Sequence, residues 1–175
     1  MRRYGVAQGP EFYDQKHLES EQRGAPKVLE LTKEISQHVV GSVLDLGCGL
    51  GVLAKFVEGL YLGIDFSPVA IRLARERNAN PQAEFILADL RQFEPTIAYD
   101  TVAIIETLEH LDEPAQIMAL ALKSATRRII LSVPQDMRGL AHVWPRWEPK
   151  DIEMMLGPGT WTYPFGPWWI GILNL

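Results

Sequence analysis

The sequence has few of the features that would place a protein outside the cytoplasm. Its 175 residues contain a single cysteine, Cys48, which excludes an internal disulfide and favours a reducing compartment. Apolar runs of roughly 18 residues, the length of a membrane-spanning helix, do not occur, and the residues that follow Arg2-Arg3 are polar and mixed. We therefore expect a cytoplasmic protein without a membrane span.

Long basic stretches are also absent. The formal net charge is −5, from 17 basic and 22 acidic residues, and no basic run is longer than Arg2-Arg3 or Arg127-Arg128. Binding to a phosphate backbone depends largely on positive charge. The charge balance argues against nucleic acid as a partner, although a local basic patch would be compatible with it.

The order of apolar and helical segments predicts the fold class. Residues 42–46, 60–65, 84–89, 99–105 and 128–133 have the character of buried strands and alternate with helical patterns, such as the one that begins at Pro26. Such alternation is typical of an α/β fold with a doubly wound, mostly parallel, Rossmann-like sheet. Residues 160–165 and 168–173 predict a C-terminal antiparallel hairpin. We expect one domain over residues 1–175.

Three glycines at alternate positions, Gly47, Gly49 and Gly51, end the first strand where a helical segment follows. Glycine tolerates positive φ and lets a ligand approach the main chain, and a helix start offers free N–H groups. A dinucleotide fingerprint would have its third glycine at Val52 instead of Gly51. The carboxylate of Asp45 would repel a pyrophosphate but could accept from an ammonium, so the pattern favours a nucleoside with a cationic tail.

Asp45-Leu46-Gly47-Cys48-Gly49-Leu50-Gly51 resembles the glycine loop of class I S-adenosylmethionine-dependent methyltransferases. The later motifs of that family are resembled, in order, by Gly63-Ile64-Asp65-Phe66-Ser67-Pro68, Ala88-Asp89-Leu90 and Glu106-Thr107-Leu108-Glu109-His110. The pattern is most similar to the O-methyltransferases of ubiquinone biosynthesis. The resemblance implies S-adenosylmethionine as cofactor and S-adenosylhomocysteine as product.

We expect specific roles for several residues, on the basis of their positions and of this resemblance. Asp65, at the end of the second strand, is placed to accept both ribose hydroxyls, unless it only begins a turn. Asp89 would accept from the adenine amino group and the N–H of Leu90 would donate to the ring, unless Asp89 only caps a turn. The expected cofactor-binding set is Tyr13, Asp45, Gly47, Gly49, Gly51, Asp65, Phe66, Asp89, Leu90 and Glu106.

Residues before Pro26 are expected to cover this site. Residues 1–17 have weak periodicity and predict an irregular arm. Similar methyltransferases use an aromatic residue of such a segment as a lid, which makes Tyr13 a candidate, with plain surface packing as the alternative. Residues 1–25 would then form the arm, 26–134 the cofactor-binding core, and 135–175 the acceptor loop and hairpin.

The acceptor side is expected to contain two histidines. His110 is our candidate general base because histidine titrates near neutral pH, the alternative being a histidine that only hydrogen-bonds its loop. By resemblance, His142 would lie close to the acceptor. We expect methyl transfer to an oxygen, or less favourably a nitrogen, of a small or carrier-bound metabolite. A methyltransferase of RNA ends and a non-catalytic cofactor-binding regulator remain alternatives.

Glu106, Glu109, His110 and His142 also resemble the metal-binding set of small-RNA 3′-end 2′-O-methyltransferases. On a helical turn the first three would share a face. Magnesium prefers oxygen and water to imidazole, and Glu-x-x-Glu-His also occurs in relatives that need no metal. We therefore expect a metal-free site.

All five tryptophans lie between Trp144 and Trp169. Such a cluster is compatible with an aromatic acceptor pocket, with a homodimer surface, or with packing of the final hairpin. The sequence leaves these three interpretations open.

Overall fold

The computed structural model describes residues 5–23, 26–138 and 141–175 of the protein. Among them, seven strands form one sheet in the order β3-β2-β1-β4-β5-β7-β6. The first five strands are parallel, while β7 is antiparallel to both of its neighbours. This topology confirms the expected fold class and the C-terminal hairpin. The strands are β1 (Val43–Leu46), β2 (Tyr61–Asp65), β3 (Ala83–Leu87), β4 (Tyr99–Ile105), β5 (Ala125–Pro134), β6 (Trp161–Phe165) and β7 (Trp168–Asn174).

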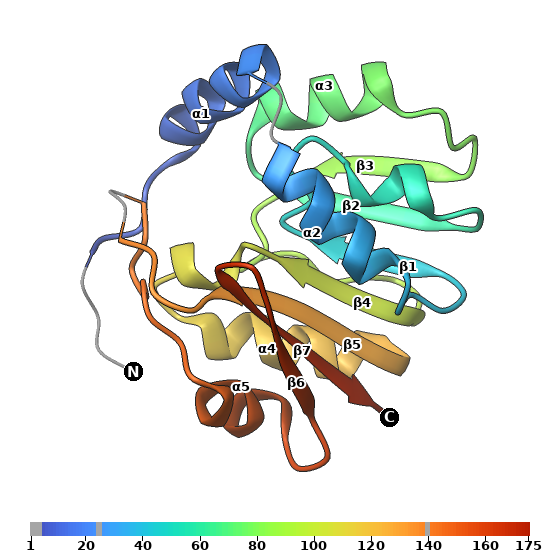
Figure 1. The fold of residues 1–175 in the computed structure, drawn as a ribbon. Helices are drawn as coiled ribbons and strands as arrows, with labels where there is room; N and C mark the ends of the chain where they lie inside the picture. The colour runs from blue at the N-terminus through green and yellow to red at the C-terminus, as the bar shows by residue number, and fades with distance from the viewer. Residues whose placement is uncertain (1–4, 24–25, 139–140) are drawn as a thin grey trace.

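Helices cover both faces of the sheet (Figure 1). One face packs against α2, α3 and the short 3-10 helix η1, and the other against α4 and α5. None of the helices in the described ranges is long and apolar enough to cross a membrane. The helices are α1 (Pro10–Arg23), α2 (Pro26–Ser36), η1 (Leu53–Phe56), α3 (Pro68–Arg77), η2 (Leu108–His110), α4 (Pro114–Ser124) and α5 (Pro149–Leu156).

Local sequence explains where two of these helices begin. Ser67 caps α3 by accepting a hydrogen bond from the N–H of Ala70, and Pro68 follows at the first helical position. At α5, the side chains of Glu148 and Asp151 form a reciprocal capping box. These caps satisfy N–H groups that a helix start leaves free.

Two local expectations are wrong. The segment expected to be an irregular arm contains the helix α1, and its first four residues lie outside the described part. The helix expected after the glycines is only the 3-10 helix η1, so the loop is not followed by a full α-helical N-terminus. In each case tertiary contacts outweighed the weak local preference.

The tryptophans mainly pack the C-terminal segments. Trp147 is fully buried in the core beneath α5, and its N–H donates to the carbonyl of Trp144. Trp168 is buried against α2, and the N–H of Trp169 donates to the carbonyl of Trp147. Trp161 is 56% exposed and stacks on Tyr163. Packing of the C-terminal segments, inside and outside the hairpin, therefore accounts for most of the cluster.

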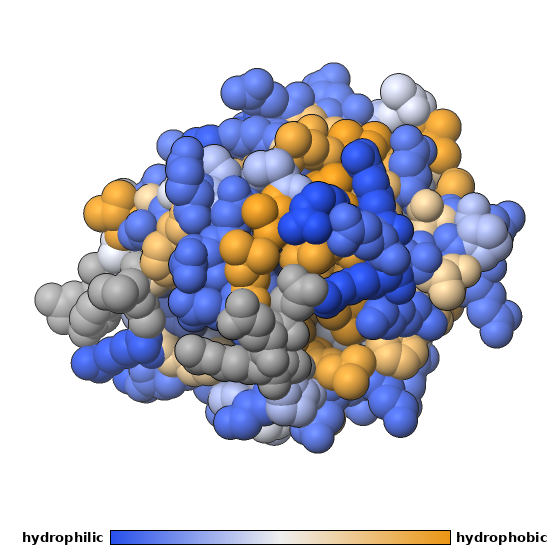
Figure 2. Space-filling view, turned by 90° about the horizontal axis from the view of Figure 1, so that it is seen from above, coloured by the Kyte–Doolittle hydropathy of each residue, from blue (hydrophilic) through white to orange (hydrophobic). Residues whose placement is uncertain are grey.

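The order of the strands places the site. The chain builds outward from β1 through β2 to β3, then returns to β4 on the other side of β1. In such sheets, ligands bind at the carboxyl ends of the strands where this reversal occurs. The face seen from above carries α1 and α3 and shows hydrophobic side chains among hydrophilic ones (Figure 2).

Candidate active site

The glycine loop follows directly on β1. The N–H groups of Gly47 and Cys48 both donate to the carbonyl of Ile64, at 2.8 and 2.9 Å, which fastens the loop to β2. Gly47 has a φ of 83°, and a Cβ added to it would lie 2.4 Å from the side-chain oxygen of Thr107. Only glycine fits this close approach to the end of β4.

Asp65 joins the ends of the first two strands. Its carboxylate accepts hydrogen bonds from the N–H of Gly49 and from the N–H of Ser67, each at 2.9 Å. The side chain is only 7% exposed, and a carboxylate has lone pairs beyond the two used here. The structure thus places Asp65 against the glycine loop at the carboxyl end of β2, as expected.

Asp45 lies beneath the loop, and only one of its two carboxylate oxygens has a hydrogen-bond partner. The hydroxyl of Tyr61 donates to its Oδ2 at 2.5 Å, whereas Oδ1 is buried without a hydrogen-bond partner. Burial raises the pKa of Asp45 to about 7, with the charge of Asp65 acting in the same direction and the Tyr61 bond against it. One carboxylate oxygen is therefore still able to accept.

Helix α1 covers the loop. The Tyr13 ring lies 5.4 Å from that of Phe66 and 5.5 Å from that of His110, and its buried hydroxyl has no partner. Burial raises the pKa of Tyr13, and the charges of Glu109 and Asp65 add to this. A Cβ on Gly49 would lie 3.3 Å from the His17 ring. Tyr13 thus lies at the site, although on a helix instead of an irregular arm.

The attachment of α1 was missed at the sequence level. Asp14 accepts hydrogen bonds from the hydroxyl of Ser67 and from the N–H of Val69, which ties α1 to the start of α3. Pro10 followed by Glu11 is a helix-start signal that could have indicated α1. Nothing local indicates that Asp14 would reach α3.

Asp89 is engaged within its own turn. Arg91 donates to Asp89 Oδ1 from its backbone N–H and from Nε, both at 2.9 Å, and also contacts Oδ2. Hydrogen bonding to Arg91 lowers the pKa of Asp89. This is the turn geometry expected as the alternative role. Leu90 is half-buried against the core, and both adenine roles stay predictions.

Glu106 adopts strained backbone just after β4. Its φ of 52° is the only positive value among the described non-glycine residues, and such a conformation costs on the order of 1–3 kcal/mol. Its N–H donates to the hydroxyl and the carbonyl of Ser132, at 3.1 and 3.3 Å. Burial raises the pKa of Glu106 to about 7. Strain of this kind is typical of functional positions.

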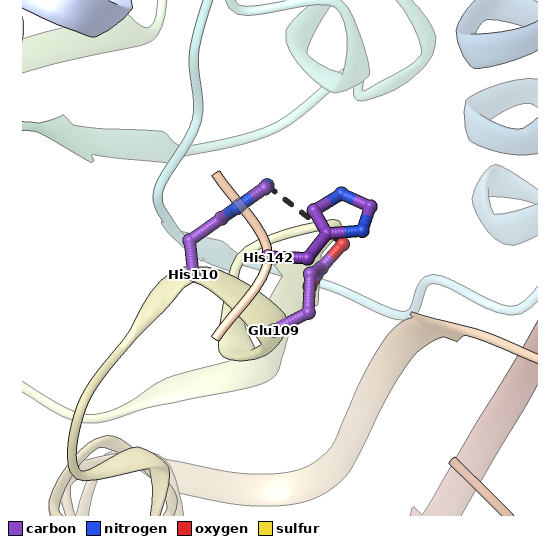
Figure 3. Close-up of side chains that lie close together, drawn as sticks. All are labelled: Glu109, His110 and His142. Carbon is purple, nitrogen blue, oxygen red and sulfur yellow. Dashed lines mark ion pairs between the residues drawn. The ribbon is translucent and has the colours of Figure 1, made fainter. Parts of the chain in front are cut away.

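Glu109, His110 and His142 lie close together (Figure 3). One ligand atom from each lies within 4.8 Å of the others. The N–H groups of Val143 and Trp144 donate to the carbonyl of Glu109 at 2.8 and 3.0 Å, which holds the segment containing His142 against η2. Glu106 is not in this group. The structure thus joins three of the four residues that resembled a metal set.

The cluster is unusual in its electrostatics. Glu109 is 0% exposed and neither of its carboxylate oxygens has a hydrogen-bond partner. Burial, then the charge of Glu106, raises the pKa of Glu109 well above its ordinary value. Burial also lowers the pKa of His110 to about 3 and lowers that of His142. His110 is therefore a weak base in this environment, and its catalytic role stays a prediction.

Comparison with known proteins identifies the family. The family model described as "Methyltransferase domain" matches residues 43–127, which contain the glycine loop, Asp65 and Asp89. The chain belongs to the class I S-adenosylmethionine-dependent methyltransferases. The match also includes Glu106, Glu109 and His110, and it ends before His142.

Individual methyltransferases are similar over part of the chain. The trans-aconitate 2-methyltransferase of Enterobacter sp. (strain 638) is 29% identical over 124 residues, 67% of this chain and 48% of that protein. The ubiquinone biosynthesis O-methyltransferase of Paraburkholderia phytofirmans is 36% identical over 89 residues, 46% of this chain and 38% of that protein. The chain spans about half the length of the curated relatives it matches.

A solved structure supports the fold assignment. The magnesium protoporphyrin IX methyltransferase of Synechocystis PCC 6803 with bound SAH superposes with a TM-score of 0.68. It is 22% identical, and the match covers 85% of this chain and 82% of that one. This similarity concerns the arrangement of the sheet and its helices.

Proposed function

We propose that the protein transfers a methyl group from S-adenosylmethionine to an oxygen of a small or carrier-bound metabolite. The observation that carries the proposal is the hydrogen bond between the N–H of Gly49 and the carboxylate of Asp65, at 2.9 Å. It joins the glycine loop to the acid at the end of β2, where a nucleoside ribose would bind. The family assignment supports the same ligand.

The residues around this bond fit the cofactor. Asp65 would accept from the ribose hydroxyls, Asp89 and Leu90 would contact the adenine, and Phe66 with Tyr13 would cover it. Two buried polar atoms without partners, Asp45 Oδ1 and the Tyr13 hydroxyl, are suited to a polar ligand. The glycine backbone at 47, 49 and 51 and the carboxylate of Glu106 complete the expected set.

When bound, S-adenosylmethionine supplies a methyl group on a positively charged sulfur. The chain must then exclude water and orient the acceptor. Helix α1 supplies the cover through Tyr13, while His110 and His142 face the acceptor side. Oxygen is favoured over nitrogen because the relatives include a named O-methyltransferase.

Calorimetry with S-adenosylhomocysteine, compared with NADH, tests the cofactor. We expect saturable binding of the first ligand and none of the second. Incubation with methyl-labelled S-adenosylmethionine and fractions of a cell extract then tests the transfer. Label should enter a small-molecule or carrier fraction. Label in RNA would overturn the proposed acceptor class, and binding without label in any fraction would favour a regulatory protein.

A further inference from the structure

We propose that Glu109, His110 and His142 bind a transition-metal dication. This differs from the metal-free site that the sequence led us to expect. The three side chains come from η2 and from the loop after β5, and their ligand atoms lie within 4.8 Å of one another (Figure 3). This inference goes beyond the proposed methyl transfer, and its metal-binding part is independent of it.

The first argument is the buried carboxylate of Glu109. It is 0% exposed, and both oxygens lack hydrogen-bond partners. Nε2 of His110 is 3.9 Å from Oε1 of Glu109, too far for a hydrogen bond. A buried carboxylate is stable only when it is neutralised, paired or bound to a metal. Its position beside two imidazoles favours a bound cation.

The second argument is the orientation of the two imidazoles. Nδ1 of His110 lies 2.8 Å from the carbonyl of Ala141, and Nδ1 of His142 lies 2.5 Å from the carbonyl of Met137. A carbonyl can only accept, so each Nδ1 carries the hydrogen and each Nε2 keeps its lone pair. Histidines that ligate metals are oriented by this kind of hydrogen bond. Both Nε2 atoms therefore carry no hydrogen and can bind a metal through their lone pairs.

The third argument is the fit of the distances and of the donor types. Ligands bound to one metal at about 2.0–2.2 Å in tetrahedral geometry lie about 3.4 Å apart. Side-chain movements of about 1 Å would therefore bring the three ligand atoms to bonding distance of one metal ion. Two nitrogens and one carboxylate suit zinc, manganese or iron better than magnesium or calcium. Three protein ligands also leave a position open for another molecule.

Lys16 is the cation that competes for this site. Its charge acts on Glu109, His110 and His142 from helix α1, yet it makes no hydrogen bond with Glu109. Its ammonium also lies 5.5 Å from the centre of the Tyr13 ring. A metal at the site must bind against this positive charge, so removing Lys16 should strengthen metal binding.

The open position gives the metal a use, which rests on the proposed function. A hydroxyl of the acceptor that binds there would lose its proton to water, while the electron pair of the broken O–H bond stays on the oxygen held by the metal. The metal would thus generate the nucleophile at neutral pH without a side-chain base.

Calorimetric titration of the whole metal-stripped protein with Zn²⁺ and with Mn²⁺ tests the site, with Mg²⁺ as comparison. We expect one equivalent of Zn²⁺ or Mn²⁺ to bind and to raise the melting temperature, with Mg²⁺ much weaker. His142→Ala and Glu109→Gln should each lose more than about 100-fold in affinity. Lys16→Gln should gain about threefold or more.

His38→Ala is the matched control, because His38 bonds to Tyr163 at a distant position and should leave metal binding unchanged. Circular dichroism checks that each variant is folded. Absence of saturable metal binding would overturn the site. So would metal binding by folded His142→Ala and Glu109→Gln that is as tight as that of the unchanged protein. S-adenosylhomocysteine binding measured on the same samples separates this failure from failure of the proposed function.

Discussion

The hydroxyl of Ser67 donates a hydrogen bond to the carboxylate of Asp14, which links the covering helix α1 to the residue that caps α3. The same Ser67 donates its backbone N–H to Asp65. The cover and the expected ribose acceptor are thus connected through one residue. Closure of α1 should therefore depend on this contact and affect cofactor binding.

Asp14→Ala should loosen α1, because it removes the acceptor of two hydrogen bonds, to Ser67 and Val69. Each bond to a carboxylate contributes roughly 1.5–3 kcal/mol, so we expect S-adenosylhomocysteine to bind at least about tenfold more weakly. Calorimetry measures the affinity, and cleavage by trypsin after Lys16 should become faster. Glu19→Ala, an exposed change on the same helix, is the control. Equal affinity and equal cleavage in both variants would rule out a lid role for α1.

Asp65→Ala should weaken cofactor binding more strongly than any other single change in the glycine-loop region. The ribose would lose a charged acceptor, at roughly 1.5–3 kcal/mol for each hydrogen bond. Asp65→Asn should retain part of the affinity, because its carbonyl oxygen still accepts. Exposed Glu113→Ala serves as control. Unchanged affinity in Asp65→Ala with an intact fold would show that the ribose is bound elsewhere.

Gly47→Ala should destabilise the protein through a steric contact. Both Gly47 and Gly159 have positive φ, 83° and 88°, but a Cβ would meet Thr107 at 2.4 Å at the first and nothing within 4 Å at the second. The left-handed conformation alone costs an alanine roughly 1–2 kcal/mol. Thermal unfolding of Gly47→Ala and of the control Gly159→Ala separates the effect of the steric contact from that of the backbone conformation. Equal melting temperatures would mean that Thr107 simply moves away.

The ionisation of Asp45 should contribute a loss of stability as pH rises. Burial raises its folded pKa to about 7, above the unfolded value near 3.8. Between these values the folded state holds a proton that the unfolded state has lost, so the unfolding free energy decreases by up to about 1.4 kcal/mol per pH unit and levels off above pH 7. Urea unfolding at several pH values measures this.

Asp45→Asn should make that pH dependence shallower, because the amide does not ionise and its oxygen can still accept from Tyr61. Glu106, whose folded pKa is also raised to about 7, would continue to contribute in the same direction. Exposed Glu76→Gln is the control and should leave the slope unchanged. A slope in Asp45→Asn equal to that of the unchanged protein would contradict the assignment.

The sequence by itself determined the central sheet and its glycine loop. Short, largely apolar runs such as Tyr99–Ile105 are typical of a buried strand, and serine followed by proline, as at Ser67-Pro68, indicates the start of a helix. The positions of Asp65 and Gly49 at the carboxyl ends of β2 and β1 could be predicted because one strand-loop-strand unit sets their spacing. These signals are local, and each is contained within a few neighbouring residues.

Only the tertiary structure determined which side chains meet on the acceptor side. Glu109 and His142 are distant in the sequence, and they meet because Val143 and Trp144 dock on the carbonyl of Glu109. The same holds for α1, whose position depends on Asp14 reaching the start of α3. Local preference decides which residues form a helix or a strand, but burial and hydrogen bonds across the sheet decide which side chains come together.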